Sequence, residues 1–200
     1  MAETTATSFK DLMNGFGVVT VMNVKLYSCT GGYTSHPAAF TKSDFEDSTL
    51  YIDTLKIANL TQEGPTKTIT GGQYANPLIK YGKTMTCEMQ DALGRGAVLE
   101  KFFGCDVSDS RISVTDKFPG AFALEGETFF IDQETGNKVT VYIFIPQFTP
   151  DAILSLTQDA EGDATVFDLN GSVSVTKISD ADGERNVFYE IREKSFFEEA

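Results

Sequence analysis

Short runs of β-branched and aromatic residues recur along this 200-residue chain, separated by Gly, Asn, Asp and Pro. Such runs favour strands because branched and aromatic side chains pack well on a pleated sheet, while the residues between them favour turns. The pattern predicts a mostly β fold, an antiparallel β-sandwich or barrel-like domain. The candidate strands span residues 18–26, 49–57, 66–70, 78–89, 112–115, 121–131, 137–145, 152–157, 164–176 and 186–193.

Two hairpins are predicted from neighbouring strands. In residues 128–145, two apolar runs flank a polar stretch that ends in Gly136-Asn137, a pair suited to a tight turn. Farther along, the acidic stretch 180–184 separates the strand candidates 173–178 and 187–191. Both hairpins pair strands that are close in sequence, which is typical of an antiparallel architecture.

One segment departs from the strand pattern and indicates a helix over residues 91–103. Its apolar or small residues are spaced by four, three, three and four positions, which places them on one helical face. Asp91 is suited to the N-cap, and Gly104 to the position just after the helix. Such an amphipathic helix needs a sheet to cover, so we expect it to flank the β domain. The positions that define the face are Met89, Leu93, Gly96, Leu99 and Phe103.

Two long extended loops are predicted, at residues 28–47 and 61–77. Both exceed the usual connection of roughly two to six residues, and loops of this length are often functional. They combine glycine with aromatic residues, which can anchor a loop in a neighbouring surface. We therefore expect contacts between subunits in these loops; the alternative is that they are ordinary surface excursions. The candidate contact residues are Tyr33, Phe40, Phe45 and Tyr74.

The composition limits the class of protein. The chain carries 29 acidic and 16 basic residues, a net charge of −13, which opposes firm binding to nucleic acid. An acidic surface also suits a wall along which nucleic acid slides without adhering, although many acidic proteins are merely soluble. The most apolar run, residues 139–145, ends at Pro146 and is too short to span a bilayer. We expect one domain over residues 1–200, with no membrane segment and no signal for secretion, made and kept in a reducing cytosol.

The residues of common active sites are scarce. The chain has one histidine, His36, and three cysteines, Cys29, Cys87 and Cys105, without zinc-knuckle spacing. It has no nucleophile elbow and no complete phosphate-binding loop. We expect no catalytic residue, metal site or cofactor, and we expect the cysteines to be small buried hydrophobic groups. The acidic stretches 159–163 and 180–184 are interpreted as solvated turns, since neither continues as a calcium-binding loop. A hydrolase with a carboxylate pair remains an alternative.

One further set of segments is informative: residues 68–95, Phe102-Phe103-Gly104, residues 126–132 and residues 164–175. Together these segments resemble the major tail protein, or tail tube protein, of tailed bacteriophages. The resemblance covers most of residues 66–176, without a diagnostic motif.

This resemblance implies a β-sandwich flanked by one helix that assembles into stacked six-membered rings. The rings would form a tail tube that conducts DNA at ejection, with the long loops bridging adjacent rings. The implied partners are copies of the chain, the tape-measure protein and other tail proteins, and DNA in transit. The implied location is the tail of the virion, after synthesis in the cytoplasm of the host bacterium. Alternatives are a head–tail connector, a tail terminator, a capsid decoration protein or a β-sandwich binding module.

Overall fold

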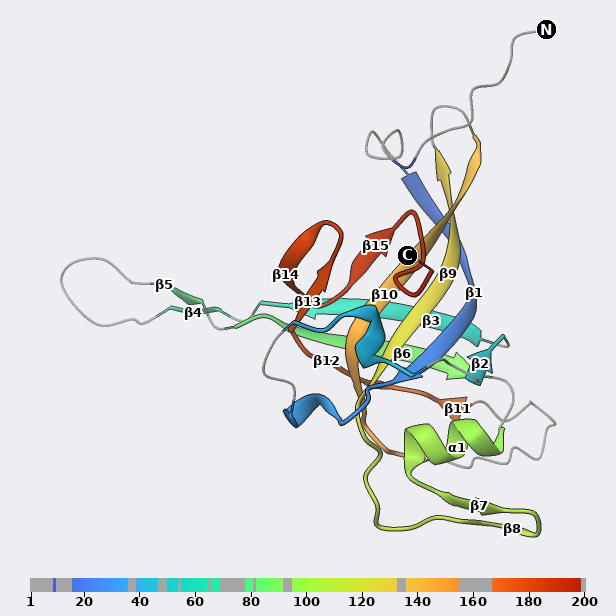
Figure 1. Cartoon of the computed structure of the whole chain (residues 1–200). Helices are drawn as coiled ribbons and strands as arrows, with labels where there is room; N and C mark the ends of the chain where they lie inside the picture. Colours follow the sequence, from blue (N-terminus) through green and yellow to red (C-terminus); the bar gives the residue numbers. More distant parts are fainter. Residues whose placement is uncertain are drawn as a thin grey trace, which may run out of the picture.

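The chain folds into antiparallel β-structure with one α-helix, as a computed structural model shows (Figure 1). The structure describes residues 9, 16–35, 39–46, 50–53, 55–64, 66–68, 78–80, 82–91, 95–132, 136–154 and 167–198. The helix α1 spans Gly96–Phe103, and the short 3₁₀ turns η2 and η3 span Tyr33–Ser35 and Lys42–Asp44. The strands are β1 (Phe16–Ser28), β2 (Leu50–Ile52), β3 (Leu55–Glu63), β4 (Thr66–Thr68), β5 (Leu78–Lys80), β6 (Thr84–Asp91), β7 (Asp106–Ser108), β8 (Arg111–Ser113), β9 (Phe122–Asp132), β10 (Lys138–Pro150), β11 (Phe167–Asp168), β12 (Gly171–Val173), β13 (Thr176–Asp180), β14 (Gly183–Val187) and β15 (Glu190–Arg192).

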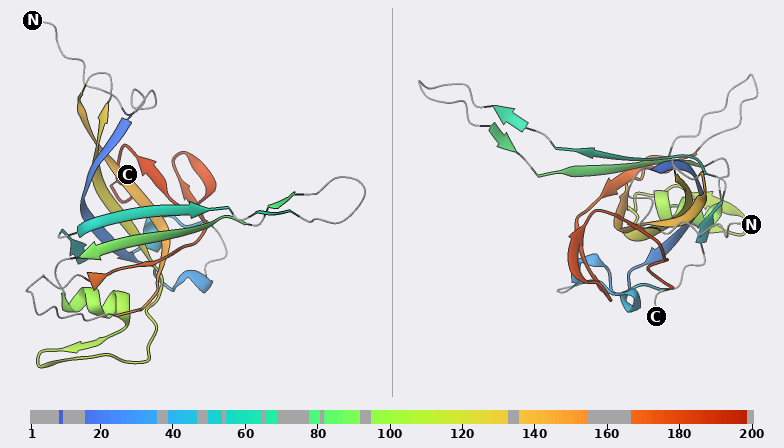
Figure 2. Two further views of the ribbon diagram at one scale, coloured as in Figure 1. Left: turned by 180° about the vertical axis from the view of Figure 1, so that it is seen from behind. Right: turned by 90° about the horizontal axis from the view of Figure 1, so that it is seen from above.

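One large sheet organises the fold. Nine strands join in the order β11-β6-β12-β10-β9-β1-β2, with β3 added to β6 and β15 added to β10. The ladders between these strands are antiparallel. The sheet curls into a half-barrel, which is clear when it is viewed from above (Figure 2, right). The predicted mostly β, barrel-like fold with one flanking helix is confirmed.

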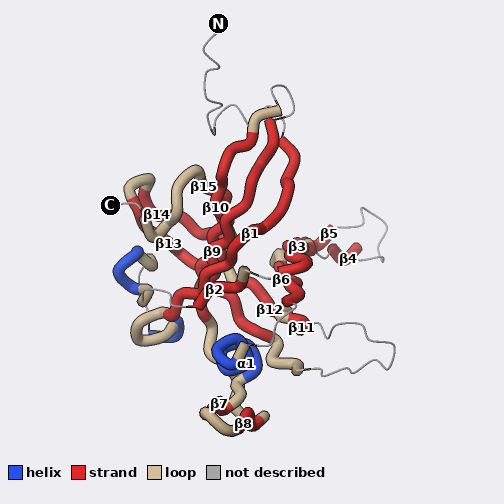
Figure 3. The backbone as a smooth tube through the Cα atoms, turned by 90° about the vertical axis from the view of Figure 1, so that its right-hand side faces the viewer, coloured by secondary structure: helices blue, strands red, loops and turns tan. Residues whose placement is uncertain are grey.

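The concave side of the half-barrel holds the main core. In β6 the side chains alternate between exposed and buried, so Met85, Cys87 and Met89 point inward. The helix α1 lies below these strands (Figure 3) and buries Val98, Leu99, Phe102 and Phe103 in the same cluster. Of the positions that the sequence pattern assigned to an apolar helical face, Leu99 and Phe103 lie on the buried face of α1, and Leu93 lies outside the described residues.

The helix begins later than the sequence predicted. Asp91 is the last residue of β6 and pairs with Leu55 and Phe167, so it does not cap the helix. Met89 also belongs to the strand ladder, although its spacing from later apolar residues matched a helix. The predicted end is confirmed, because Gly104 follows the helix in a left-handed conformation, with φ of 66°.

Several strand boundaries also differ from the prediction. Residues 49–57 form two strands, interrupted after Ile52, and residues 78–89 contain a break before β6. β10 continues past Pro146 because a register shift between Ile145 and Phe148 accommodates the proline. Residues 151–154 are not a strand, and 155–157 lie outside the described residues. The predicted hairpin over residues 128–145 is confirmed, because β9 pairs with β10. The second hairpin does turn within residues 180–184, but its second strand is β14, residues 183–187, and residues 190–192 form β15, which pairs with β10 instead.

The first half of the predicted loop 61–77 is strand. β3 continues to Glu63, and the paired strands β4 and β5 extend the β3–β6 pair away from the body of the molecule (Figure 2). We call the β4–β5 hairpin the arm. Within the described part of the chain, no helix is both long and apolar enough to span a membrane.

Candidate functional site

Three of the four aromatic residues predicted to contact a neighbour lie in an internal cluster of the chain. Phe40 and Phe45 are buried, at 5% and 7% exposure, and pack on Phe144 and Ile178. Tyr33 packs at the margin of this cluster, where burial raises the pKa of its hydroxyl. This hydroxyl donates a 2.6 Å hydrogen bond to the carbonyl of Pro146. Tyr74 and the lone His36 lie outside the described residues.

The described part of loop 28–47 is pinned to the sheet and the β13–β14 hairpin. The Phe40 amide donates to the Lys177 carbonyl at 2.7 Å, and the Ser179 amide donates to the Phe40 carbonyl at 2.8 Å. Phe40 and Phe45 therefore hold this loop down by filling the core of their own subunit. Contact between this loop and a neighbouring subunit stays a prediction. The residues on the surface of the loop would have to make that contact.

The end of the chain completes the same aromatic cluster, which the sequence pattern did not indicate. Phe196 stacks on Phe144 with ring centroids 4.3 Å apart, and Phe197 stacks on Tyr27 at 3.4 Å. Stacked rings add to the free energy gained by burying their area. The residues after β15 are consequently part of the packed structure.

A buried carboxylate holds this terminal segment. Glu125 is 2% exposed and accepts hydrogen bonds from the Ser195 hydroxyl at 2.7 Å and from the Phe196 amide at 2.8 Å. Burial raises the pKa of Glu125, while these two donors oppose the rise. Both carboxylate oxygens are engaged by the protein itself, which favours a structural role over acid–base catalysis.

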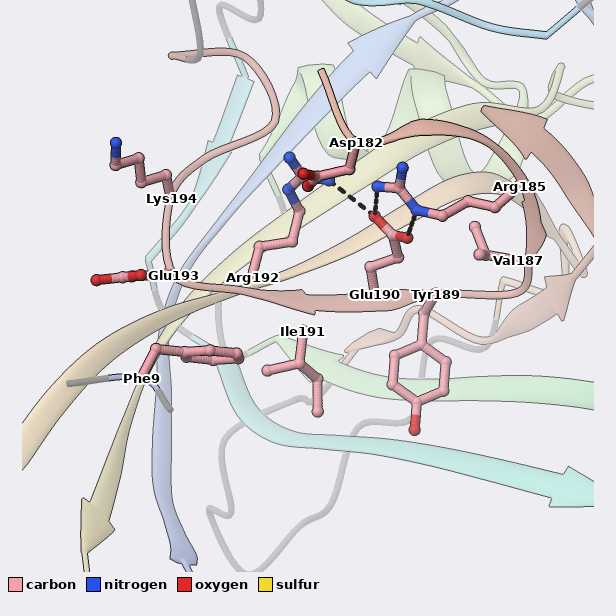
Figure 4. Close-up of a pocket in the computed structure, with 10 residues that line it drawn as sticks. All are labelled: Phe9, Asp182, Arg185, Val187, Tyr189, Glu190, Ile191, Arg192, Glu193 and Lys194. Carbon is pink, nitrogen blue, oxygen red and sulfur yellow. Dashed lines mark hydrogen bonds and ion pairs between the residues drawn. The ribbon is translucent and has the colours of Figure 1, made fainter. Parts of the chain in front are cut away.

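A cavity of about 610 Å³ lies beside β14 and β15, and most of the residues that line it are charged. Glu190 lies between Arg185 and Arg192 (Figure 4) and binds both guanidinium groups. Asp180 accepts two parallel bonds from Arg185, at 2.7 and 2.8 Å, and one from Arg192 at 2.8 Å. The two acids thus pair with two bases and fasten the β13–β14 hairpin to β15. We interpret this network as a structural clamp.

The clamp predicts a specific pH dependence. Hydrogen bonds from Arg185, the largest cause, hold the pKa of Asp180 well below its ordinary value of 3.8. Because this pKa is lowered on folding, the stabilisation is present above pH 3.8 and is lost as the pH falls toward the folded-state pKa. Asp180→Asn should lower the free energy of unfolding by about 2 kcal/mol at neutral pH.

Urea unfolding at pH 7 and at several values below pH 4 would measure this effect. The difference between wild type and Asp180→Asn should shrink as the pH falls. Asp182→Asn, in the exposed turn of the same hairpin, is the matched control and should change little. A difference that stays constant down to the lowest pH would contradict the clamp.

The cysteines are poor nucleophiles in this fold. Burial raises the pKa of Cys87 to about 12 and also raises the pKa values of Cys29 and Cys105. The thiolate is the reactive form, and a raised pKa lowers its fraction at neutral pH. Cys87 and Cys105 are buried as predicted, whereas Cys29 is partly exposed. Across the described residues, no three metal-binding side chains of the His, Cys, Asp and Glu types lie together.

Unpaired strand edges are a further surface feature. On the side away from β6, β3 has no strand partner in the described part of the chain. The same holds for β1 over residues 16–23, because β2 pairs only with Val24, Lys25 and Leu26. Open edges offer rows of backbone donors and acceptors to another chain. These two edges are therefore candidate surfaces for association with another chain.

Comparison with known proteins agrees with this interpretation. Residues 105–189 match the sequence model of the YomU/Tube protein family. This match confirms the predicted resemblance to phage tail tube proteins. The matched segment runs from the end of α1 to just before β15 and includes the central strands β9 and β10. No curated protein matches the chain.

The tube-family match bears on the class of function. It suggests a structural component of the phage tail rather than an enzyme. This agrees with the internal pairing of Glu125, Asp180 and Glu190 and with the raised pKa of Cys87.

Proposed function

We propose that this chain assembles with copies of itself into stacked rings, which we expect to be hexameric, and that these rings form the tail tube through which a bacteriophage ejects its DNA. The observation that carries the proposal is the tube-family match over residues 105–189. The whole chain, residues 1–200, acts in this proposal as one domain.

The sheet edges support closure of the ring. The outer edge of β3 and the outer edge of β1 over residues 16–23 lie at the two ends of the large sheet. A ring closes when two different surfaces of each subunit meet in a repeated contact. Pairing the β3 edge of one subunit with the β1 edge of the next would satisfy both rows of backbone groups.

The arm supports contacts with subunits that lie away from the half-barrel. β4 and β5 lie well outside the half-barrel (Figure 2), so the arm can reach a subunit in the same ring or in the next one. Contact with such a neighbouring subunit is the role that we propose for loop 61–77. The predicted contact residue Tyr74 belongs to this loop.

The charge supports a passage for DNA. With a net charge of −13, an assembled tube repels phosphate groups, which favours transit over retention. The further proposed partners are a tape-measure protein and other tail proteins, and the proposed location is the tail of the virion. No cofactor is required.

Electron microscopy of the purified, concentrated protein tests this function. We expect tubes or stacked rings of uniform width, with sixfold symmetry in end views. Isolated single rings would instead favour a head–tail connector or a tail terminator. Dispersed monomers at all concentrations would contradict self-assembly and would favour a binding module.

A further inference from the structure

Large apolar side chains are exposed together on one projecting segment. We call residues 106–118, which follow α1 and contain β7 and β8, the projection. It lies at the end of the molecule beyond α1 (Figure 1). Val107, Ile112, Val114 and Phe118 are 40%, 55%, 66% and 88% exposed. Clustered exposed apolar groups, unlike scattered ones, mark interaction surfaces.

The projection is held in place by polar contacts at its base. The Thr115 hydroxyl donates to the Gly104 carbonyl at 3.0 Å, and the Lys117 ammonium group donates to Asp106 at 2.8 Å. β7 also packs on the start of α1, where a methyl group of Val107 lies close to Gly96. These contacts fix the backbone of the projection, while the side chains of Ile112, Val114 and Phe118 remain largely in solvent.

An apolar groove of about 480 Å³ lies within the half-barrel. Its walls come from β1, β9 and β10 on one side and from β3 and β6 on the other, and they include Val24, Leu60, Met89, Leu124 and Ile143. Every residue that lines it is uncharged. A groove of this volume can take a few apolar side chains.

The groove and the projection lie at opposite sides of the main core. In Figure 3 the strands that line the groove stand above α1, and β7 and β8 lie below it. α1 packs against the same core cluster as Val24, Met89 and Leu124. The projection of a subunit therefore cannot reach its own groove.

We propose that the projection of one subunit docks in the apolar groove of a second copy of this chain. Both surfaces are apolar. Because they lie at opposite sides of the core, each copy can present its projection to the copy on one side and its groove to the copy on the other. A head-to-tail contact of this kind repeats into a filament. The inference rests on the proposed function and identifies the contact between successive rings.

Charge favours a second copy at this position. Copies that each carry −13 repel one another over most of their surfaces. The groove is uncharged, and the projection contains three acids and two bases, so both are nearly neutral. Association through these two surfaces therefore meets little repulsion and removes apolar side chains from water.

Paired variants test the contact. Ile112→Ser combined with Phe118→Ser removes apolar groups from the projection but leaves the groove intact. Leu60→Lys places a charge in the groove but leaves the projection intact. Val175→Ser, at an exposed apolar site outside the projection, is the matched control. We expect the projection variant and the groove variant to lose tube formation, measured by light scattering and microscopy, while Val175→Ser forms tubes as wild type does.

A mixture of the two variants gives the decisive measurement. The variant with a changed projection keeps an intact groove, and the variant with a changed groove keeps an intact projection. One copy of each should therefore bind to the other. Growth should then stop, because the two surfaces left over on this pair are the altered ones. We expect ultracentrifugation of the mixture to show particles of twice the mass that either variant shows alone. Unchanged masses on mixing would overturn the head-to-tail contact.

Cross-linking provides a second readout that does not depend on the groove variant being folded. In a Cys29→Ser background, Ile112→Cys and Leu60→Cys in one chain should form disulfides between copies and give a ladder of multimers under oxidising conditions. Wild-type tubes with no ladder, and tubes formed by the projection variant, would reject this contact while leaving the proposed function intact. Failure of wild-type protein to assemble would overturn both.

Discussion

Replacing Phe148 by Ala should lower the free energy of unfolding by about 3–5 kcal/mol. Phe148 is fully buried at the centre of the main core, with ring centroids 5.4 Å from Phe122 and 5.8 Å from Phe102. Gly171 lies directly against it, because a Cβ at that position would be 2.5 Å from the Phe148 ring. Truncation would leave a cavity enclosed by the helix and two strands. Chemical denaturation monitored by circular dichroism would measure the loss.

The matched control is the same truncation on the surface. Phe118 is 88% exposed, so Phe118→Ala should change the free energy of unfolding by less than about 0.5 kcal/mol. Equal losses in the two variants would show that the core around Phe148 is not packed as described.

The second large effect is expected at the end of the helix. Gly104 has a φ of 66°, and a Cβ placed on it would lie 2.2 Å from the backbone carbonyl oxygen of Lys117. Gly104→Ala therefore combines the cost of a left-handed conformation with a collision against the main chain. We expect a loss of about 2–4 kcal/mol and displacement of the segment that leads from the projection to β9.

Gly136→Ala is the control that separates the cost of the left-handed conformation from the cost of the collision. Gly136 has a φ of 71°, but no atom lies within 4 Å of the position that a Cβ would occupy. This control should cost only about 1 kcal/mol, the conformational penalty alone. Thermal unfolding of both variants would compare them, and an equal change in melting temperature would argue against the close approach at Gly104.

Part of the candidate site could not be predicted from the sequence, because it depends on which strands become neighbours in the fold. Asp180, Glu190 and Arg192 are hydrophilic residues near a turn and the chain end, and only the docking of β15 on β10 brings them together with Arg185. The aromatic residues of loop 28–47 were recognised as anchors, but spacing cannot distinguish an anchor in the same subunit from one in a neighbour. The structure places Phe40 and Phe45 in the core of their own subunit.

The sequence by itself determined the mostly β class, the hairpin β9–β10, the turn between β13 and β14, the end of the helix at Gly104 and the resemblance to tail tube proteins. These features depend on alternation, turn residues and glycine geometry, which are local properties of the chain. Tertiary structure alone decided the curl of the sheet, the start of α1 after residue 91, and the separation of the projection from the groove. Each arises from contacts between residues distant in sequence, such as the ladder that draws Asp91 into β6, and such contacts override local periodicity.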